Sequence, residues 1–137
     1  MPPTTSRDFQ KVAGQRLTTA EALRRAKLNL DAQYLGGYTV ECSLKALILE
    51  LTPDANRAEV LAKITTGAKM HRSEVLLGEL RDLGVALPID LARRIRRFAK
   101  SWTVDLRYET GRRDSGETAA LLTTAKAIYD WVEGQLP

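Results

Sequence analysis

The sequence predicts an all-α protein, an antiparallel bundle of four to six helices that forms a single domain over residues 1–137. Apolar residues recur at three- and four-residue steps through most of the chain, which is the period of one helix face. The alternation of apolar and polar residues that marks a strand is rare. A composition of 44% apolar and 28% charged residues is that of an ordinary globular chain. The length allows a core made of several helices.

The first helix is expected over residues 6–29, with Ser6 as its N-cap. Thr18 and Glu21 have the spacing of a capping box, which would start a new helix inside this segment. The apolar stripe nevertheless runs through that point without a break, so the pattern favours one long helix. The stripe consists of Phe9, Ala13, Leu17, Ala20 and Leu23.

The second helix is expected over residues 31–51 and is apolar around most of its circumference, as a central helix should be. It ends before Thr52 because the residue that precedes a proline is disfavoured in the α conformation. Gly36 and Gly37 lie inside it and weaken it by roughly 1 kcal/mol each relative to alanine. We interpret them as the place where a neighbouring backbone approaches closely.

Three shorter helices are expected over residues 57–65, 73–83 and 89–104. The second of these stops at Gly84, a suitable residue for the position after a helix. Residues 105–116 are polar and rich in arginine and glycine, which indicates a loop. The last helix is expected over residues 117–134, with an apolar stripe made of Leu121, Ala125, Ile128 and Val132.

Glu41 and Lys45 form a charge pair at i, i+4 within the second helix. One interpretation is an exposed pair of little energetic consequence. The other places Glu41 in the interior, because it falls on the apolar face between Gly37 and Leu44, and a buried carboxylate needs a partner. Arg107 is the candidate partner, so the predicted polar core consists of Glu41, Lys45 and Arg107.

The stretch "LDAQYLGGYTVECSLKALIL" resembles the second helix of bacterial HEPN-domain proteins, the higher eukaryotes and prokaryotes nucleotide-binding family. "FQKVAGQRLTTAEAL" is similar to the first helix of that family, and "SWTVDLRYETG" is similar to its Trp-then-Arg-Tyr segment. His71, with the leucines that follow it, is similar to the histidine-leucine helix. The resemblance covers nearly the whole chain, and its specific part is the run from Gly37 to Ala46.

The resemblance implies a helical bundle that is often a homodimer, with a functional groove between the subunits. Some members are ribonucleases that carry an arginine and a histidine with four to six residues between them. Arg107 is the candidate arginine here, but Arg112, Arg113 and Asp114 occupy the positions of the histidine. Other members accompany a minimal nucleotidyltransferase or act as toxin or antitoxin partners.

The segment "LARRIRRFAK" has an apolar stripe on one face of the expected helix and a set of cations on the opposite face. A solvated surface, or acids from another helix, would account for these charges, and so would bound nucleotide or RNA phosphate. Arg112 and Arg113 extend the positive region into the following loop. The predicted nucleotide- or RNA-binding residues are Arg107, Arg112, Arg113, Arg93, Arg96, Arg97 and Lys100, with Arg94 beside them.

Other classes of site find little support. The one cysteine, Cys42, cannot form a disulfide within the chain, and together with His71 it cannot fill a zinc site. We therefore expect no metal and no cofactor. The start "MPPTTSRDF" has no apolar leader, and no apolar run is long enough to span a membrane. The cytoplasm is the expected location, and His71 is expected to make a polar contact or to begin a helix.

The function predicted from the sequence is a non-catalytic HEPN-type module. It would bind nucleotide or RNA phosphate, or dock to a nucleotidyltransferase in a toxin-antitoxin-like pair, and it is expected to be a homodimer. The alternative is a metal-independent ribonuclease that uses Arg107 with Tyr108 or His71. The missing histidine favours the non-catalytic module.

Overall fold

The computed structural model describes all residues 1–137, and it contains helices and no strands. This confirms the predicted all-α bundle. The α-helices are α1 (Ser6–Arg25), α2 (Asn29–Leu51), α3 (Arg57–Ile64), α4 (Ser73–Asp82), α5 (Ile89–Ser101) and α6 (Ser115–Gln135). Three short 3-10 turns connect them, η1 (Asp54–Asn56), η2 (Ala68–His71) and η3 (Val104–Tyr108).

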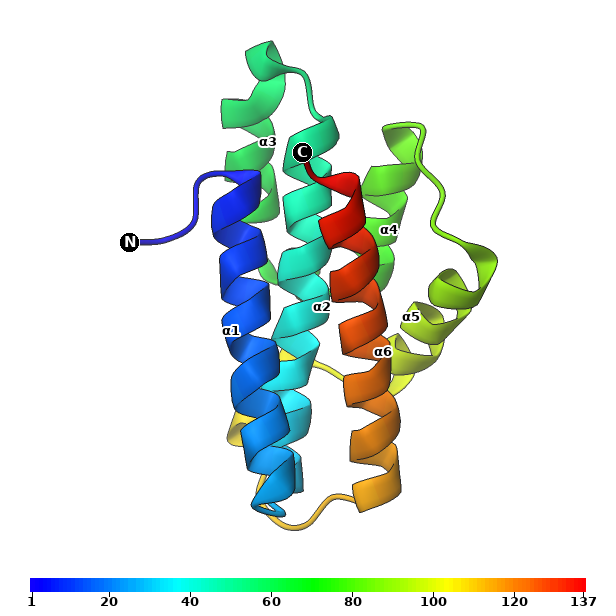
Figure 1. The fold of residues 1–137 in the computed structure, drawn as a ribbon. Coiled ribbons are helices and arrows are strands. Elements are labelled where there is room, and N and C mark those ends of the chain that lie inside the picture. Colours follow the sequence, from blue (N-terminus) through cyan, green and yellow to red (C-terminus); the bar gives the residue numbers. More distant parts are fainter.

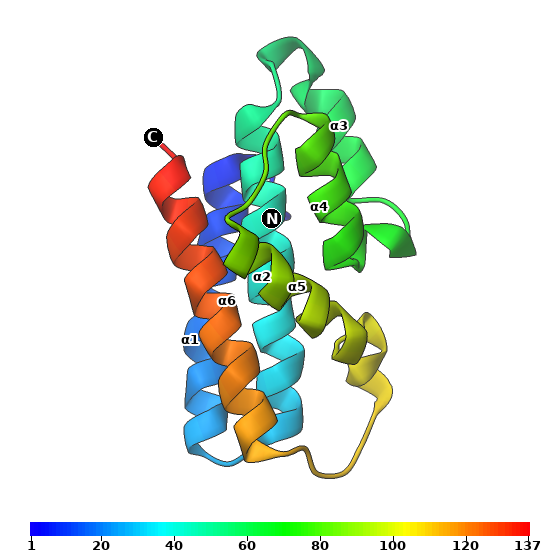
Figure 2. The same ribbon diagram turned by 90° about the vertical axis from the view of Figure 1, so that its right-hand side faces the viewer.

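The three long helices, α1, α2 and α6, lie side by side along the molecule (Figure 1). The shorter helices α3 and α4 pack against the other side of α2, and α5, which contacts α4 and α6, crosses the long helices obliquely (Figure 2). Helix α2 is therefore the central element, and its residues from Thr39 to Leu49 are all buried. One continuous apolar cluster of 25 buried residues joins the elements.

The N-cap of α1 lies one residue earlier than the sequence predicted. Thr5, and not Ser6, is the N-cap, and it forms a reciprocal capping box with Asp8. Thr18 does not restart the helix, since its hydroxyl donates to the Gly14 carbonyl oxygen within an unbroken α1. One long helix was therefore the correct interpretation.

The turn between α1 and α2 corrects the predicted end of the first helix at residue 29. The N–H of Lys27 donates to the Arg24 carbonyl and that of Leu28 donates to the Leu23 carbonyl, which is the Schellman arrangement of a helix end. Lys27 takes the position that usually holds glycine, and its φ of 63° is left-handed. Asn29 consequently belongs to α2.

The two glycines of α2 receive side chains rather than a neighbouring backbone, which corrects the sequence interpretation. A Cβ at Gly36 would lie 2.5 Å from a Leu122 methyl. A Cβ at Gly37 would lie 1.9 Å from the Trp102 indole. The indole N–H donates to the Gln33 carbonyl at 3.0 Å, so Gly37 makes the room in which α5 attaches to α2.

The remaining elements match the prediction to within a few residues. The inward face of α5 is buried as expected and comprises Leu91, Ile95, Phe98 and, just after the helix, Trp102. The expected loop at residues 105–116 contains η3, where Leu106 is buried against the bundle. Helix α6 begins two residues early because Asp114 caps it, accepting from the Glu117 N–H at 2.8 Å.

Candidate functional site

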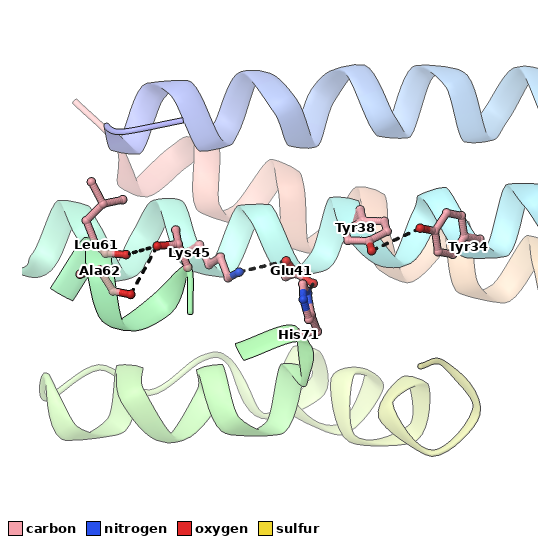
Figure 3. A network of polar contacts seen from close by, with 8 residues as sticks. Tyr34, Tyr38, Glu41, Lys45, Leu61, Ala62 and His71 are labelled. Atoms are coloured by element: carbon pink, nitrogen blue, oxygen red, sulfur yellow. Dashed lines mark hydrogen bonds and ion pairs between the residues drawn. The ribbon is translucent and has the colours of Figure 1, made fainter. Parts of the chain in front are cut away.

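The centre of α2 carries a buried ionic network, which is the second of the two interpretations that the sequence left open for Glu41. Glu41 and Lys45 are each only 4% exposed, and the Lys45 ammonium donates to Glu41 Oε2 at 3.0 Å. The other carboxylate oxygen, Oε1, lies 3.0 Å from His71 Nδ1 (Figure 3). Both oxygens of Glu41 therefore have a cationic or hydrogen-donating partner, which a buried carboxylate requires.

Arg107 takes no part in this network, so the predicted Glu41–Arg107 pair is wrong. Arg107 lies in η3 with an exposed side chain, and its guanidinium carbon sits 4.7 Å from the centre of the Tyr108 ring. Tyr108 is itself 76% exposed. The partner of Glu41 is instead His71, which reaches α2 from η2, a four-residue turn without a periodic pattern.

His71 is half-buried and is held in one orientation by Glu41. An ionised carboxylate can only accept, so Nδ1 carries the hydrogen and Nε2 is free for other contacts. His71 also lines a cavity of about 310 Å³ together with Ser73, Trp102 and Asp105. Neither Arg107 nor Tyr108 lines that cavity, so the structure does not bring the three candidate ribonuclease residues into one site.

Tyr38 and Cys42 flank Glu41 on α2 and are both poor candidates for a reactive group. Burial, with the hydrogen bond to Tyr34, raises the pKa of Tyr38 well above its usual range. Burial, with the Glu41 charge, raises the pKa of the Cys42 thiol to about 12. Both side chains therefore stay protonated at neutral pH, and Cys42 is a core residue rather than a nucleophile.

The predicted basic residues of α5 form an exposed face opposite its buried stripe. We call this set the α5 basic face, and it consists of Arg93, Arg96, Arg97 and Lys100. None of the four forms an ion pair, whereas the neighbouring Arg94 pairs with Asp90 at 3.1 Å. Glu117 lines a small cavity beside Arg97 but makes no ion pair with it. The acids of other helices thus leave this face uncompensated.

Arg112 and Arg113 do not line the small cavity beside Arg97 but a separate, larger one. It has a volume of about 540 Å³ and is lined by residues of the turn between α1 and α2 and of the loop before α6. That loop passes the corner between α1 and α2 (Figure 1). Lys27 lines the same cavity, which sequence reasoning missed because Lys27 was placed inside a helix. Arg113 is ion-paired with Glu109, while Arg112 is exposed and makes no ion pair.

No three His, Cys, Asp or Glu side chains come together in an arrangement that could hold a metal ion. None of the helices has the length and apolar character needed to cross a membrane.

Comparison with known proteins places the whole bundle in one family. No curated protein and no solved structure matches the chain significantly. The HEPN domain family profile, in contrast, matches residues 6–135, which extends from the first residue of α1 to the last residue of α6. The match includes the elements that carry the Glu41 network, the α5 basic face and the cavity at the α1–α2 corner, and the chain belongs to the HEPN domain family.

Proposed function

We propose that this HEPN-domain protein is a non-catalytic binding module that holds the phosphate backbone of single-stranded RNA on the α5 basic face. Membership of the family points to a function related to nucleotides or RNA. The observation that carries the proposal is the set of four exposed cations on one helix face without an acidic partner. Cations in this arrangement attract a polyanion and release its condensed counterions on binding.

The geometry of the face suits a charged backbone better than a single small anion. With 3.6 residues per turn, the four side chains fall within an arc of about 100°, and they extend over about 10 Å of the helix axis. Their mutual repulsion raises the free energy of the unbound protein, so neutralisation by phosphate is favourable. Exposed aromatic rings are scarce here, which favours contacts to phosphates over stacking on bases.

The salt dependence of RNA binding tests the proposal. We expect a fluorescently labelled single-stranded RNA to bind the wild-type protein with an affinity that falls steeply as KCl is raised. Replacement of Arg93, Arg96 and Arg97 by alanine should weaken binding at every sequence tested. It should also reduce the slope of log K against log[salt] by about 2, since each phosphate contact in single-stranded RNA contributes about 0.7. Fluorescence anisotropy measures both quantities.

A triple variant of Lys11, Arg24 and Lys69 to alanine is the matched control. These three cations are exposed and lie on other elements, so the net charge changes equally while the α5 basic face stays intact. Equal affinities and slopes for the two triple variants would show that net charge alone attracts RNA. That result would remove the basis of the proposed function.

A second candidate function, a metal-independent ribonuclease, is favoured by one observation, the orientation of His71 by Glu41. A carboxylate that fixes Nδ1 leaves Nε2 suited to general acid–base chemistry. Incubation of labelled RNA with the protein in EDTA tests this candidate. Cleavage that is abolished in His71→Asn would support the enzyme over the binding module, and intact RNA would exclude it.

The predicted homodimer and the predicted nucleotidyltransferase or toxin-antitoxin partner remain proposals that accompany this function. Sedimentation velocity of the purified protein tests the first, because a dimer would have about twice the 15.2 kDa mass of the chain.

A further inference from the structure

We infer that the cavity at the α1–α2 corner is a binding site for a phosphate monoester, either the phosphate of a free nucleotide or the 5′ end of an RNA. The cavity has a volume of about 540 Å³, within the range of small-molecule sites. It is lined by Lys27, Leu28, Asn29, Leu30, Gly111, Arg112 and Arg113. The site is separate from the α5 basic face and does not depend on it.

The charges around the cavity match a doubly charged anion. Three cationic side chains line it and no carboxylate does. Arg113 is neutralised by Glu109, which leaves Lys27 and Arg112 as two uncompensated cations. A phosphate monoester carries a charge of about −1.5 to −2 at neutral pH, whereas an internal phosphodiester carries only one. The balance of charge therefore favours a terminal phosphate over the backbone of a polymer.

Backbone donors add to these cations. Helix α2 starts at Asn29 after Leu28, an N-cap residue whose side chain cannot accept a hydrogen bond. The N–H groups of Asn29 and Leu30 have no acceptor in the structure, and both residues line the cavity. Unpaired N–H groups at the start of a long helix bind anions well. The site thus combines two free cations with free backbone donors within one cavity.

The cavity also has room and polarity for more than phosphate. Leu28, which is half-exposed, offers an apolar surface to a nucleoside. Asn29 also lines the cavity, and its buried Oδ1 atom, which accepts no hydrogen bond from the protein, can accept one from a ligand hydroxyl or amine only if the amide rotates into the cavity. A nucleotide or an RNA end supplies phosphate, hydroxyl and amine groups together, which is why we name this class.

The test compares ligands that differ only in the terminal phosphate. One arm measures adenosine 5′-monophosphate against adenosine by calorimetry, and the other measures one RNA with a 5′-phosphate against the same RNA with a 5′-hydroxyl. We expect the phosphate to tighten binding about tenfold or more in at least one arm, since hydrogen bonds to charged groups are the stronger class. Lys27→Gly combined with Arg112→Ala should abolish the difference. Lys11→Ala, an exposed cation elsewhere on α1, should leave it unchanged.

Leu28→Asp separates the role of the cavity from that of the fold. Aspartate at this position can cap α2 and should leave the thermal midpoint unchanged or raised. Its carboxylate also repels a phosphate and occupies the free N–H groups, so the phosphate-dependent difference should disappear. Loss of that difference with an intact fold would support the site, and its retention would overturn it.

The two arms also identify the source of the phosphate. An effect in the nucleotide arm assigns the site to a free nucleotide, and an effect in the RNA arm alone assigns it to an RNA end. Equal binding with and without the phosphate in both arms would overturn the inference. Alanine substitutions on the α5 basic face should not change nucleotide binding. The nucleotide measurement therefore tests the cavity even if the α5 basic face does not bind RNA.

Discussion

Glu41 is held by side chains from two elements, Lys45 one turn along α2 and His71 from η2. The two partners differ in their access to water. Lys45 is as buried as Glu41, whereas the side chain of His71 is partly exposed to solvent. Removal of the carboxylate therefore isolates the lysine more than the histidine.

We expect Glu41→Ala to lower the free energy of unfolding by about 3–5 kcal/mol, because it leaves the Lys45 ammonium buried without a counter-charge. The apolar double variant Glu41→Leu with Lys45→Met should lose less than Glu41→Ala alone, since no isolated charge remains. Urea unfolding at pH 7 measures both. A loss below about 0.5 kcal/mol for Glu41→Ala would show that the carboxylate is solvated in solution.

The residue scale also marks how far the site could be predicted from sequence. The position of Glu41 on an apolar face correctly indicated burial and a partner. The identity of the partner could not be read, because His71 lies 30 residues away in a 3-10 turn that has no periodic pattern. An arginine in an arginine-rich segment was the more obvious candidate, yet Arg107 stays at the surface on Tyr108.

At the scale of elements, the packing of Trp102, at the end of α5, against α2 requires that Gly37 has no side chain. The Trp102 indole occupies the position of a Cβ on Gly37 and is anchored by its hydrogen bond to Gln33. Glycine normally weakens a helix, and Gly37 lies within the regular helix α2. Glycine is therefore required here because a larger residue would overlap the indole, not because the backbone needs a special conformation.

We expect Gly37→Ala to destabilise the protein by about 3 kcal/mol, because the indole must be displaced from a packed position. Gly78→Ala is the matched control, since Gly78 lies within α4 and a Cβ there meets no atom within 4 Å. That substitution should stabilise the protein by about 0.5–1 kcal/mol through helix propensity alone. Thermal unfolding of the two variants tests the comparison, and similar shifts in the same direction would contradict it.

Element boundaries were predictable where a chemical signal marks them. The proline after Thr52 and the glycine at position 84 correctly predicted the ends of α2 and α4. The end of α1 carries no such signal, because Lys27 adopts the left-handed conformation that glycine usually supplies. The prediction therefore ran the first helix through the turn and missed the cavity that this turn helps to form.

At the scale of the whole molecule, a single continuous core makes local changes felt globally. Cys42 lies within the 25-residue cluster, on the central helix. Its thiol has a pKa of about 12 in the folded protein against an ordinary value of 9.0. Because the unfolded thiol ionises first, its contribution to stability is complete below pH 9 and is lost as the pH rises toward 12.

We expect the stability of the wild-type protein to fall between pH 9 and 11 more steeply than that of Cys42→Ala, with a difference in slope of up to about 1.4 kcal/mol per pH unit. Urea unfolding across this pH range measures the slopes. Tyr38, whose raised pKa acts in the same direction, is present in both proteins and cancels in the comparison. Parallel curves would mean that the thiol ionises within the folded protein without penalty.

The architecture as a whole was more predictable than its surface chemistry. Helical periodicity predicted the all-α bundle because burial of apolar stripes is what assembles it. The neighbours of Arg112 and Arg113 could not be predicted in this way, since a polar loop has no periodic pattern that indicates which element it passes. The structure places these loop arginines beside Lys27.

The seating of Trp102 on Gly37 provides an internal optical reporter. The chain has two tryptophans, and Trp102 is the buried one, sealed between α5 and α2. Its emission is therefore expected at short wavelength while the two helices are joined and should move to longer wavelength when they separate. Detachment of α5, the helix that presents the basic face, can thus be followed spectroscopically without attaching a dye.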